Sequence, residues 1–172
     1  MELILWRHAD AKDAAPGKPD AERSLTARGI KQAQRMADWL RKRLPADARV
    51  LASPARRAQQ TARAFNKHFE TVQEVGTTAD AQSVLKAAGW PDGDGAVVVV
   101  GHQPTLGQAA ALAVTGRTSD WSVKKGAIWW IENRGHGETV VRAVIAPELL
   151  SNERREARGE SRKALGVNRR HQ

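Results

Sequence analysis

The chain has 172 residues and carries 28 Lys and Arg against 19 Asp and Glu, a formal net charge of +9. This length suits one domain with a substantial core, and the absence of cysteine excludes disulfides, thiolate zinc sites and a cysteine nucleophile. The positive charge favours an anionic partner, such as nucleic acid, polyphosphate, an acidic protein surface or a phosphorylated substrate.

The first part of the chain predicts a strand followed by a helix. Residues 2–6 form a short apolar run that is typical of a buried strand. Thr26 is a suitable N-cap for a helix that ends at Pro45, because apolar residues recur between them at spacings of three and four. These apolar residues are Ile30, Ala33, Ala37, Leu40 and Leu44.

The middle of the chain predicts three further units of a strand and a helix. The strands cover residues 49–52, 71–75 and 96–100. The first helix begins with Ser53 as its N-cap and Pro54 in its first turn, the second covers residues 81–88, and the third ends at Gly116. The last of these strands is a continuous β-branched run, "VVVV", which is typical of a strand covered on both faces, as in a parallel sheet.

The remaining segments complete the predicted domain. "AIWWIEN" and "TVVRAVI" read as two strands joined by the glycine-rich turn "RGHGE", which indicates an antiparallel pair at one side of the sheet. The alternation predicts a three-layer α/β/α sandwich with a mostly parallel central sheet over residues 1–150. Residues 151–172 are polar and arginine-rich, and we interpret them as a basic tail that is either a solvated helix or disordered.

Three groups of basic residues directly follow predicted strands. Arg7 and His8 follow the first strand, "SPARRAQQTA" follows the second, and His102 follows "VVVV". Because the carboxyl ends of parallel strands share one edge of a sheet, we expect these groups to meet there. Arg56 and Arg57 lie in the first turn of a helix, where the helix dipole disfavours cations and attracts anions, so the pattern indicates a bound phosphate.

The predicted pocket contains two histidines and several arginines. Guanidinium forks match the oxygens of a phosphoryl group, so such a pocket suits a phosphorylated ligand. It suits a divalent metal poorly, because the arginines repel the ion and no third ligand lies at a diagnostic spacing. We therefore predict neither a metal nor a cofactor.

The motifs resemble those of a known family. "LWRHADA", "LASPARRAQQTA" and "VVVVGHQP" are similar to the phosphate-pocket motifs of the histidine phosphatase, or phosphoglycerate mutase-like, superfamily. "RSLTARG" is similar to its small phosphohistidine phosphatases of the SixA type, and the matches keep their order from residue 1 to about 146. The resemblance implies the matching sandwich fold and a phosphatase that uses a phosphohistidine intermediate.

The resemblance also implies roles for individual residues. His8 is the nucleophile that becomes phosphorylated, Arg7 and Arg57 hold the phosphoryl oxygens, and His102 is the second pocket histidine. Arg23 matches an arginine that the small members place near the phosphate. The surrounding arginines should lower the pKa of His8 and keep its imidazole neutral, and a protonated His102 would add to the stabilisation of the phosphoryl charge.

Two departures from the family pattern affect the chemistry. Ala9 stands where the family carries glycine, and Gln103 stands where acid phosphatases carry aspartate. The chain therefore shows no dedicated general acid, and Asp10 and Glu74 are the candidates for that role. Because imidazole leaves a phosphoramidate more readily than an alkoxide leaves an ester, we predict a phosphatase that acts on phosphohistidine of a protein.

Two alternatives remain at this point. The chain could be a phosphomonoesterase of the same superfamily that acts on a small phosphorylated molecule. It could instead be a non-catalytic phosphate- or polyanion-binding module that uses its basic surface and the tail at residues 151–172. No run approaches membrane-spanning length and no signal-peptide pattern is visible, so we expect a cytoplasmic protein without a membrane partner.

Overall fold

The structure is a computed structural model that describes residues 1–150. One six-stranded sheet has the order β3-β2-β4-β1-β5-β6. The strands are β1 (Glu2–Arg7), β2 (Arg49–Ala52), β3 (Glu70–Thr71), β4 (Ala96–Gly101), β5 (Ile128–Asn133) and β6 (Thr139–Ile145). The helices are α1 (Ala27–Arg41), α2 (Arg56–Phe65), α3 (Ala81–Ala88) and α4 (Thr105–Thr115), with 3₁₀ turns η1 (Asp20–Glu22), η2 (Gln73–Val75) and η3 (Pro147–Leu150).

The sheet is parallel at its centre and antiparallel at one side. β1 and β4 pair in parallel, as do β4 with β2 and β2 with β3. β5 pairs antiparallel with β1, and β6 pairs antiparallel with β5. The predicted mostly parallel sheet with an antiparallel strand pair near the C-terminus is confirmed.

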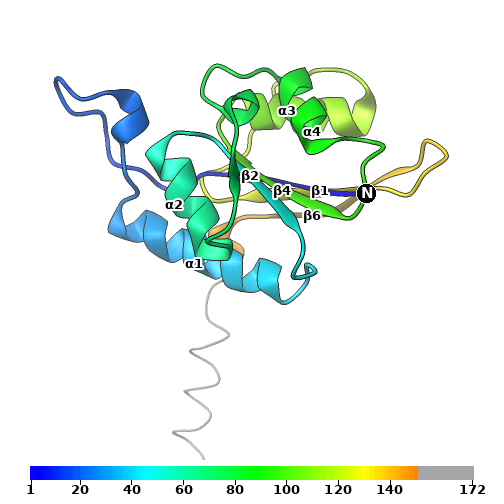
Figure 1. The fold of residues 1–172 in the computed structure, drawn as a ribbon, viewed down its shortest axis with the longest axis horizontal. Helices are drawn as coiled ribbons and strands as arrows, with labels where there is room; N and C mark the ends of the chain where they lie inside the picture. The colour runs from blue at the N-terminus through cyan, green and yellow to red at the C-terminus, as the bar shows by residue number, and fades with distance from the viewer. Residues whose placement is uncertain (151–172) are drawn as a thin grey trace, which may run out of the picture.

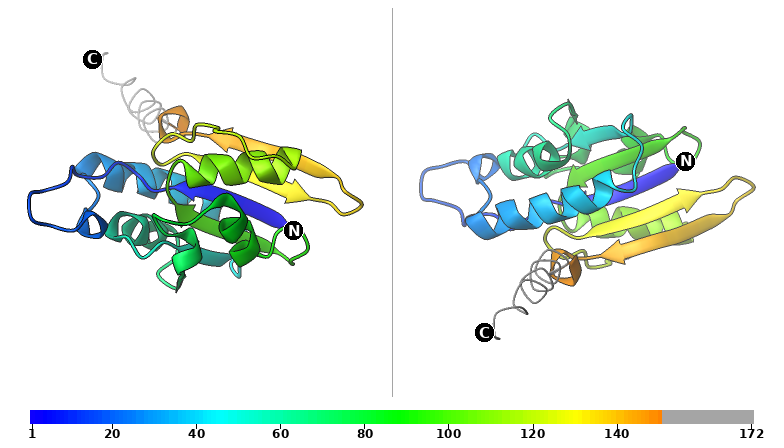
Figure 2. Two further views of the ribbon diagram at one scale, coloured as in Figure 1. Left: turned by 90° about the horizontal axis from the view of Figure 1, so that it is seen from above. Right: turned by 90° about the horizontal axis from the view of Figure 1, so that it is seen from below.

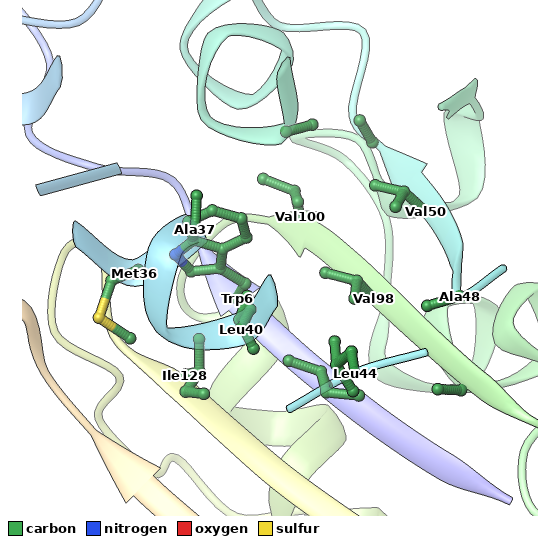
Figure 3. Packing of buried hydrophobic residues seen from close by; sticks show 14 of the residues in the cluster. Trp6, Met36, Ala37, Leu40, Leu44, Ala48, Val50, Val98, Val100 and Ile128 are labelled. Atoms are coloured by element: carbon green, nitrogen blue, oxygen red, sulfur yellow. The ribbon is translucent and has the colours of Figure 1, made fainter. Parts of the chain in front are cut away.

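Helices cover the two faces of the sheet, as the sandwich prediction requires (Figure 1). Alternate residues of β1 point to opposite faces, because side chains of a strand alternate. Ile4 and Trp6 pack in the core layer that contains residues of α1 and α2, such as Met36 (Figure 3). Leu3 and Leu5 pack in the opposite layer with residues of α3 and α4.

The boundaries of α1 follow from its capping and from one close approach. Thr26 caps the helix as predicted, since its side chain accepts a hydrogen bond from the N–H of Gly29. A Cβ atom on Gly29 would lie 1.9 Å from the carbonyl oxygen of Asp10, so only glycine fits where the two segments touch. The prediction that Ile30 faces the core is wrong: its side chain is exposed, and Gly29 and Met36 belong to the buried stripe instead. The helix ends at Arg41, before the predicted limit at Pro45.

Two other boundaries differ from the sequence prediction. α2 has Ala55 as its N-cap, and Ser53 precedes the helix, where its hydroxyl accepts a hydrogen bond from the N–H of Ala55. Pro54 therefore lies outside the first turn. The predicted strand at 71–75 is a two-residue strand, β3, followed by the turn η2.

Residues 12–24 form an exposed loop whose ends are held together. Ala11 and Leu25 make an antiparallel bridge, and the N–H of Lys12 donates to the carbonyl of Ser24 at 2.8 Å. The loop, drawn in blue in Figure 2, extends beyond the body of the domain at the end opposite the label N. It carries the turn η1, which has no buried residue.

The last two sequence predictions concern the C-terminal tail and membrane-spanning segments. The basic tail predicted at 151–172 lies outside the described residues. Among the helices of residues 1–150, none combines the length and the apolar character needed to cross a membrane.

Candidate active site

A pocket of about 260 Å³ lies at the carboxyl ends of the two central strands. β1 leads into Arg7 and His8, and the neighbouring strand β4 leads into His102, so the topology brings these residues together. The pocket is lined by Arg7, His8, Ala11, Asp20, Arg23, Arg57, Thr77, His102, Gln103 and Lys125. The sequence-predicted residues Arg7, His8, Arg23, Arg57 and His102 thus share one cavity.

His8 is held with one ring nitrogen free to react. Its Nδ1 atom lies 2.8 Å from the carbonyl oxygen of Ala9, which can only accept, so Nδ1 carries the proton. Nε2 therefore presents a lone pair, which accepts a hydrogen bond from Nε of Arg57 at 3.3 Å. Burial, followed by the charges of Arg57, Arg7 and Arg23, lowers the pKa of His8 to about 4. At neutral pH the imidazole is uncharged and nucleophilic.

The backbone beside His8 is fixed by a buried threonine of α2. Oγ1 of Thr61 accepts a hydrogen bond from the N–H of Ala9 at 3.1 Å and donates to the carbonyl of Arg57 at 2.8 Å. Among residues 1–150 the one non-glycine residue with a positive φ is His136, so Ala9 does not need a glycine-like conformation. The family's glycine is therefore replaced here without backbone strain.

Arg57 occupies the centre of the pocket and is 4% exposed. Besides its contact with His8, its Nη1 donates to the carbonyl of Asp20 and its Nη2 to Oδ2 of Asp20, each at 3.0 Å. Its neighbour Arg56 is exposed and does not line the pocket, as its position on α2 requires. The buried member of the pair is thus the one that matches the family motif.

Arg7 and Arg23 approach the pocket from two other segments. Nη1 of Arg7 donates to the carbonyl of Val123 at 2.8 Å, while its buried Nε has no hydrogen-bond partner. Arg23 donates through Nε to Oδ1 of Asp20 at 2.8 Å and through Nη1 to the carbonyl of Lys12 at 2.9 Å. The guanidinium groups of Arg7, Arg23 and Arg57 therefore line one cavity.

His102 is buried beside Ser53, and its imidazole is uncharged at neutral pH. Its Nε2 lies 2.7 Å from Oγ of Ser53, and its ring centroid is 5.2 Å from that of His8. Burial, then the neighbouring His8 and Arg57, lowers the pKa of His102 to about 3. Burial and nearby positive charge both disfavour the imidazolium, so His102 is neutral at neutral pH, and its protonation beside a phosphoryl group stays a prediction.

Asp20 is a pocket residue that the sequence analysis missed. Its carboxylate pairs with Arg23 through Oδ1 and with Arg57 through Oδ2. Among residues 1–150 it is the one carboxylate that lines this pocket. The hydrogen bond from Arg23 and the charges of Arg57 and Arg23 lower the pKa of Asp20, so it is ionised at neutral pH. The only signal in the sequence is its position three residues before Arg23, which alone is weak.

The two carboxylates proposed as acids lie elsewhere. Oδ2 of Asp10 accepts a hydrogen bond from Thr26 at 2.8 Å, and Oδ1 pairs with Lys125 at 3.0 Å, so both oxygens are engaged in holding α1 and the loop before β5. Glu74 is exposed on η2 and does not line the pocket. Neither carboxylate lines the pocket that contains His8.

Gln103 lines the pocket, but both ends of its amide are engaged. Its Nε2 donates to the carbonyl of Trp121 at 2.9 Å, and its Oε1 accepts from the N–H of Gly107 at 2.8 Å. It therefore braces a neighbouring loop against α4. Within residues 1–150, no three His, Asp or Glu side chains are grouped closely enough to hold a metal ion.

Taken together, the fold and the site define an α/β protein with a basic oxyanion pocket around a neutral, hydrogen-bonded histidine. The family model described as "Histidine phosphatase superfamily (branch 1)" matches residues 3–82. The chain is 30% identical over 126 residues to the phosphohistidine phosphatase SixA of Escherichia coli strain K12, covering 69% of this chain and 77% of that protein. This chain belongs to the histidine phosphatase superfamily.

Solved structures agree with this assignment. A structure of the protein histidine phosphatase SixA complexed with tungstate superposes with a TM-score of 0.75 at 27% identity, covering 87% of this chain and 99% of that one. A phosphoserine phosphatase mutant from Entamoeba histolytica, in complex with phosphoserine, has a TM-score of 0.64 at 16% identity over 86% of this chain and 98% of that one. The second likeness extends to the fold alone.

Proposed function

We propose that this protein is a metal-independent phosphohistidine phosphatase that acts through a phosphorylated His8. The observation that carries the proposal is the state of His8: a neutral ring whose Nδ1–H is anchored on a carbonyl and whose Nε2 lone pair faces the buried Arg57. The relative solved with tungstate supports it, because tungstate is a tetrahedral oxyanion of the same shape as phosphate. The match to a phosphohistidine phosphatase supports the substrate class.

The proposed reaction has two displacements at phosphorus. Nε2 of His8 attacks the phosphoryl group, forming a P–N bond while the bond to the substrate's nitrogen breaks and its electron pair stays on the leaving imidazole. Water then attacks the phosphorus of phospho-His8: a P–O bond forms, the P–Nε2 bond breaks with its electron pair returning to Nε2, and the protons of the water leave with the inorganic phosphate. Phosphoryl transfer depends mainly on positioning and on stabilising charge, which buried donors supply efficiently.

Each arginine has a defined part in this reaction. Arg57 releases Nε2 of His8 and the carboxylate of Asp20, keeps its Nη1 on the backbone carbonyl of Asp20, and offers Nε and Nη2 to the phosphoryl oxygens. Arg7 contributes its unpaired Nε–H. Arg23 lies at the mouth of the pocket, where it can contact an outer oxygen. A bound dianion favours protonation of His102, because a nearby negative charge stabilises the imidazolium.

The state of the carboxylates within residues 1–150 supports this substrate class, because Asp20, the one that lines the pocket, is ionised and pairs with Arg23 and Arg57. An ester substrate needs a proton for its departing alkoxide, whereas Asp10 is engaged with Thr26 and Lys125 and Glu74 lies outside the pocket. An imidazole needs no such donor when its second nitrogen already carries a proton. We therefore propose a phosphohistidine-bearing protein as the substrate. A small-molecule phosphomonoesterase is the second candidate, favoured by the three arginines of the pocket, which match the phosphoryl group of any such substrate.

The proposal is tested by phosphate release in the presence of EDTA. The substrates are a protein phosphorylated on histidine and an aryl phosphate ester, and the enzymes are wild type, His8→Ala and His68→Ala. His68 is exposed and does not line this pocket, so it is the matched control. We expect release from phosphohistidine by wild type and His68→Ala, and none by His8→Ala.

Other outcomes would assign a different function. A preference for the ester would identify a phosphomonoesterase. Release by His8→Ala at the wild-type rate would remove His8 as the nucleophile, and no release from either substrate would favour an anion-binding module.

A further inference from the structure

We propose that Asp20 is a specificity-determining residue whose carboxylate selects a protonated imidazole as the leaving group. The inference rests on the proposed function of the pocket and adds a role for a residue that the resemblance does not assign. The pocket has an unusual feature: Arg57, which is expected to hold the phosphoryl group, and Arg23, which is expected near it, already pair with a carboxylate of the protein.

The carboxylate of Asp20 contacts guanidinium groups that the phosphoryl group of the substrate also needs. Nη2 of Arg57 lies 3.0 Å from Oδ2 of Asp20, and Nε of Arg23 lies 2.8 Å from Oδ1. A phosphoryl group within reach of His8 also needs the guanidinium of Arg57, which is the group that contacts both. Asp20 must therefore give up Arg57 when the phosphoryl group binds.

The displaced carboxylate cannot move far from the pocket. The backbone carbonyl of Asp20 accepts a hydrogen bond from Nη1 of Arg57 at 3.0 Å, which holds η1 against α2 independently of the side chain. Arg23, only three residues away, remains beside the carboxylate. The side chain of Asp20 is 56% exposed, whereas that of Arg57 is 5% exposed, so Asp20 lies on the solvent side of Arg57.

The leaving group comes to the same side. His8 is 7% exposed and forms the buried end of the pocket. In a displacement at phosphorus the attacking and leaving atoms are roughly in line, so the leaving group points away from His8, toward the mouth. The carboxylate of Asp20 is then the negative charge next to the departing group.

That charge favours one class of leaving group. When its second nitrogen carries a proton, the ring of a phosphorylated imidazole is positively charged, and a carboxylate that accepts a hydrogen bond from this N–H stabilises the protonated form. When the P–N bond breaks, its electron pair stays on the leaving nitrogen, the other nitrogen keeps its proton, and neutral imidazole departs. An alkoxide or phenoxide develops negative charge at the same place and is repelled.

The test compares two substrates on two variants. Asp20→Asn keeps the shape of the side chain and removes its charge, and Glu22→Gln removes an exposed charge from the same turn as a matched control. We measure kcat/KM for a phosphohistidine protein and for an aryl phosphate ester, between about pH 6 and 8, where imidazole titrates. Circular dichroism melting verifies that each variant is folded.

The expected result is a change of selectivity. Asp20→Asn should lose about tenfold or more in kcat/KM for phosphohistidine, with a larger loss at higher pH, where fewer substrate imidazoles are protonated without the carboxylate. Its kcat/KM for the aryl ester should rise, because the repulsion of the departing phenoxide is removed. Glu22→Gln should resemble wild type on both substrates.

Two results would overturn the inference while leaving the proposed function intact. One is an equal loss on both substrates, which would make Asp20 a residue that positions Arg57 and Arg23. The other is no change on either substrate. A wild-type protein that releases no phosphate from phosphohistidine would instead refute the proposed function, and this inference with it.

Discussion

Replacing Thr61 by valine tests how far the reactive histidine depends on one hydroxyl group. Thr61 is fully buried in α2, and its Oγ1 joins the N–H of Ala9 to the carbonyl of Arg57. It therefore ties the residue after His8 to the helix that carries the central arginine. Valine has a similar shape but can neither accept nor donate, so the N–H of Ala9 loses its partner inside the protein.

The size of the effect follows from this lost partner. A buried donor without an acceptor lowers the free energy of unfolding by about 1 to 3 kcal/mol. The carbonyl of Arg57 can still accept through its other lone pair, so its loss of the Thr61 hydroxyl adds no further cost. In a domain of this size, each kcal/mol changes the melting temperature by about 2 to 4 °C. We expect Thr61→Val to melt roughly 3 to 10 °C below wild type, and kcat/KM to fall at least about tenfold as His8 loses its fixed position.

Thermal unfolding monitored by circular dichroism, together with phosphate release, measures both effects. Thr78→Val makes the same chemical change at an exposed position and should leave both unchanged. If the two variants melted within about 1 °C of each other, the hydroxyl of Thr61 would not support the site as argued. A stable Thr61→Val with full activity would refute the reasoning entirely.

Two further predictions follow from the charges of the site. His8 and His102 have pKa values of about 4 and about 3 in the folded chain against 6.5 for an ordinary histidine, so below pH 6.5 the unfolded chain binds more protons. The free energy of unfolding should therefore fall as the pH is lowered from 6.5 to about 4, and His102→Gln should flatten this slope in pH-dependent melting; an unchanged slope would contradict it. Asp10→Asn should cost about 1 kcal/mol of stability by urea unfolding, because Asp10 bonds Thr26 and Lys125, and should keep kcat within about threefold of wild type. A hundredfold loss of kcat in that variant would restore Asp10 as the acid.

The sequence predicted the part of the site that depends on strand order. Arg7, His8 and His102 each follow a central parallel strand, and side chains at adjoining strand ends must be neighbours. The apolar periodicity located α1, because burial of one face dominates its sequence pattern, and the other three helices lie where the alternation of strands and helices predicted them. Arg57 could be preferred to Arg56 from the motif, and the structure buries Arg57 and exposes Arg56.

Other features depend on contacts that a local pattern does not contain. The buried stripe of α1 includes Gly29 and Met36, and excludes Ile30, because the backbone of Asp10 packs against the first turn of the helix. Asp20 lies in an exposed loop without periodicity, and its partner Arg57 is 37 residues further along the chain. Nothing near Asp20 in the sequence indicates that its carboxylate enters a basic pocket.

The charge balance of the pocket explains why three arginines, two neutral histidines and one carboxylate occur together. Arg7, Arg23 and Arg57 bring three positive charges to one cavity, while His8 and His102 are held neutral and Asp20 contributes the opposing charge. Lys125 also lines the cavity, but its charge is paired with Asp10. The remaining excess of two positive charges matches a phosphoryl dianion, which can bind without leaving a buried guanidinium unpaired. In the proposed reaction, the arginines that bind the dianion also disfavour protonation of His8, so the charges that attract the substrate also preserve the lone pair of Nε2. A buried histidine with a carboxylate at its side would lose this property, because the carboxylate would favour the imidazolium; here the carboxylate contacts the arginines and leaves Nε2 of His8 to Arg57.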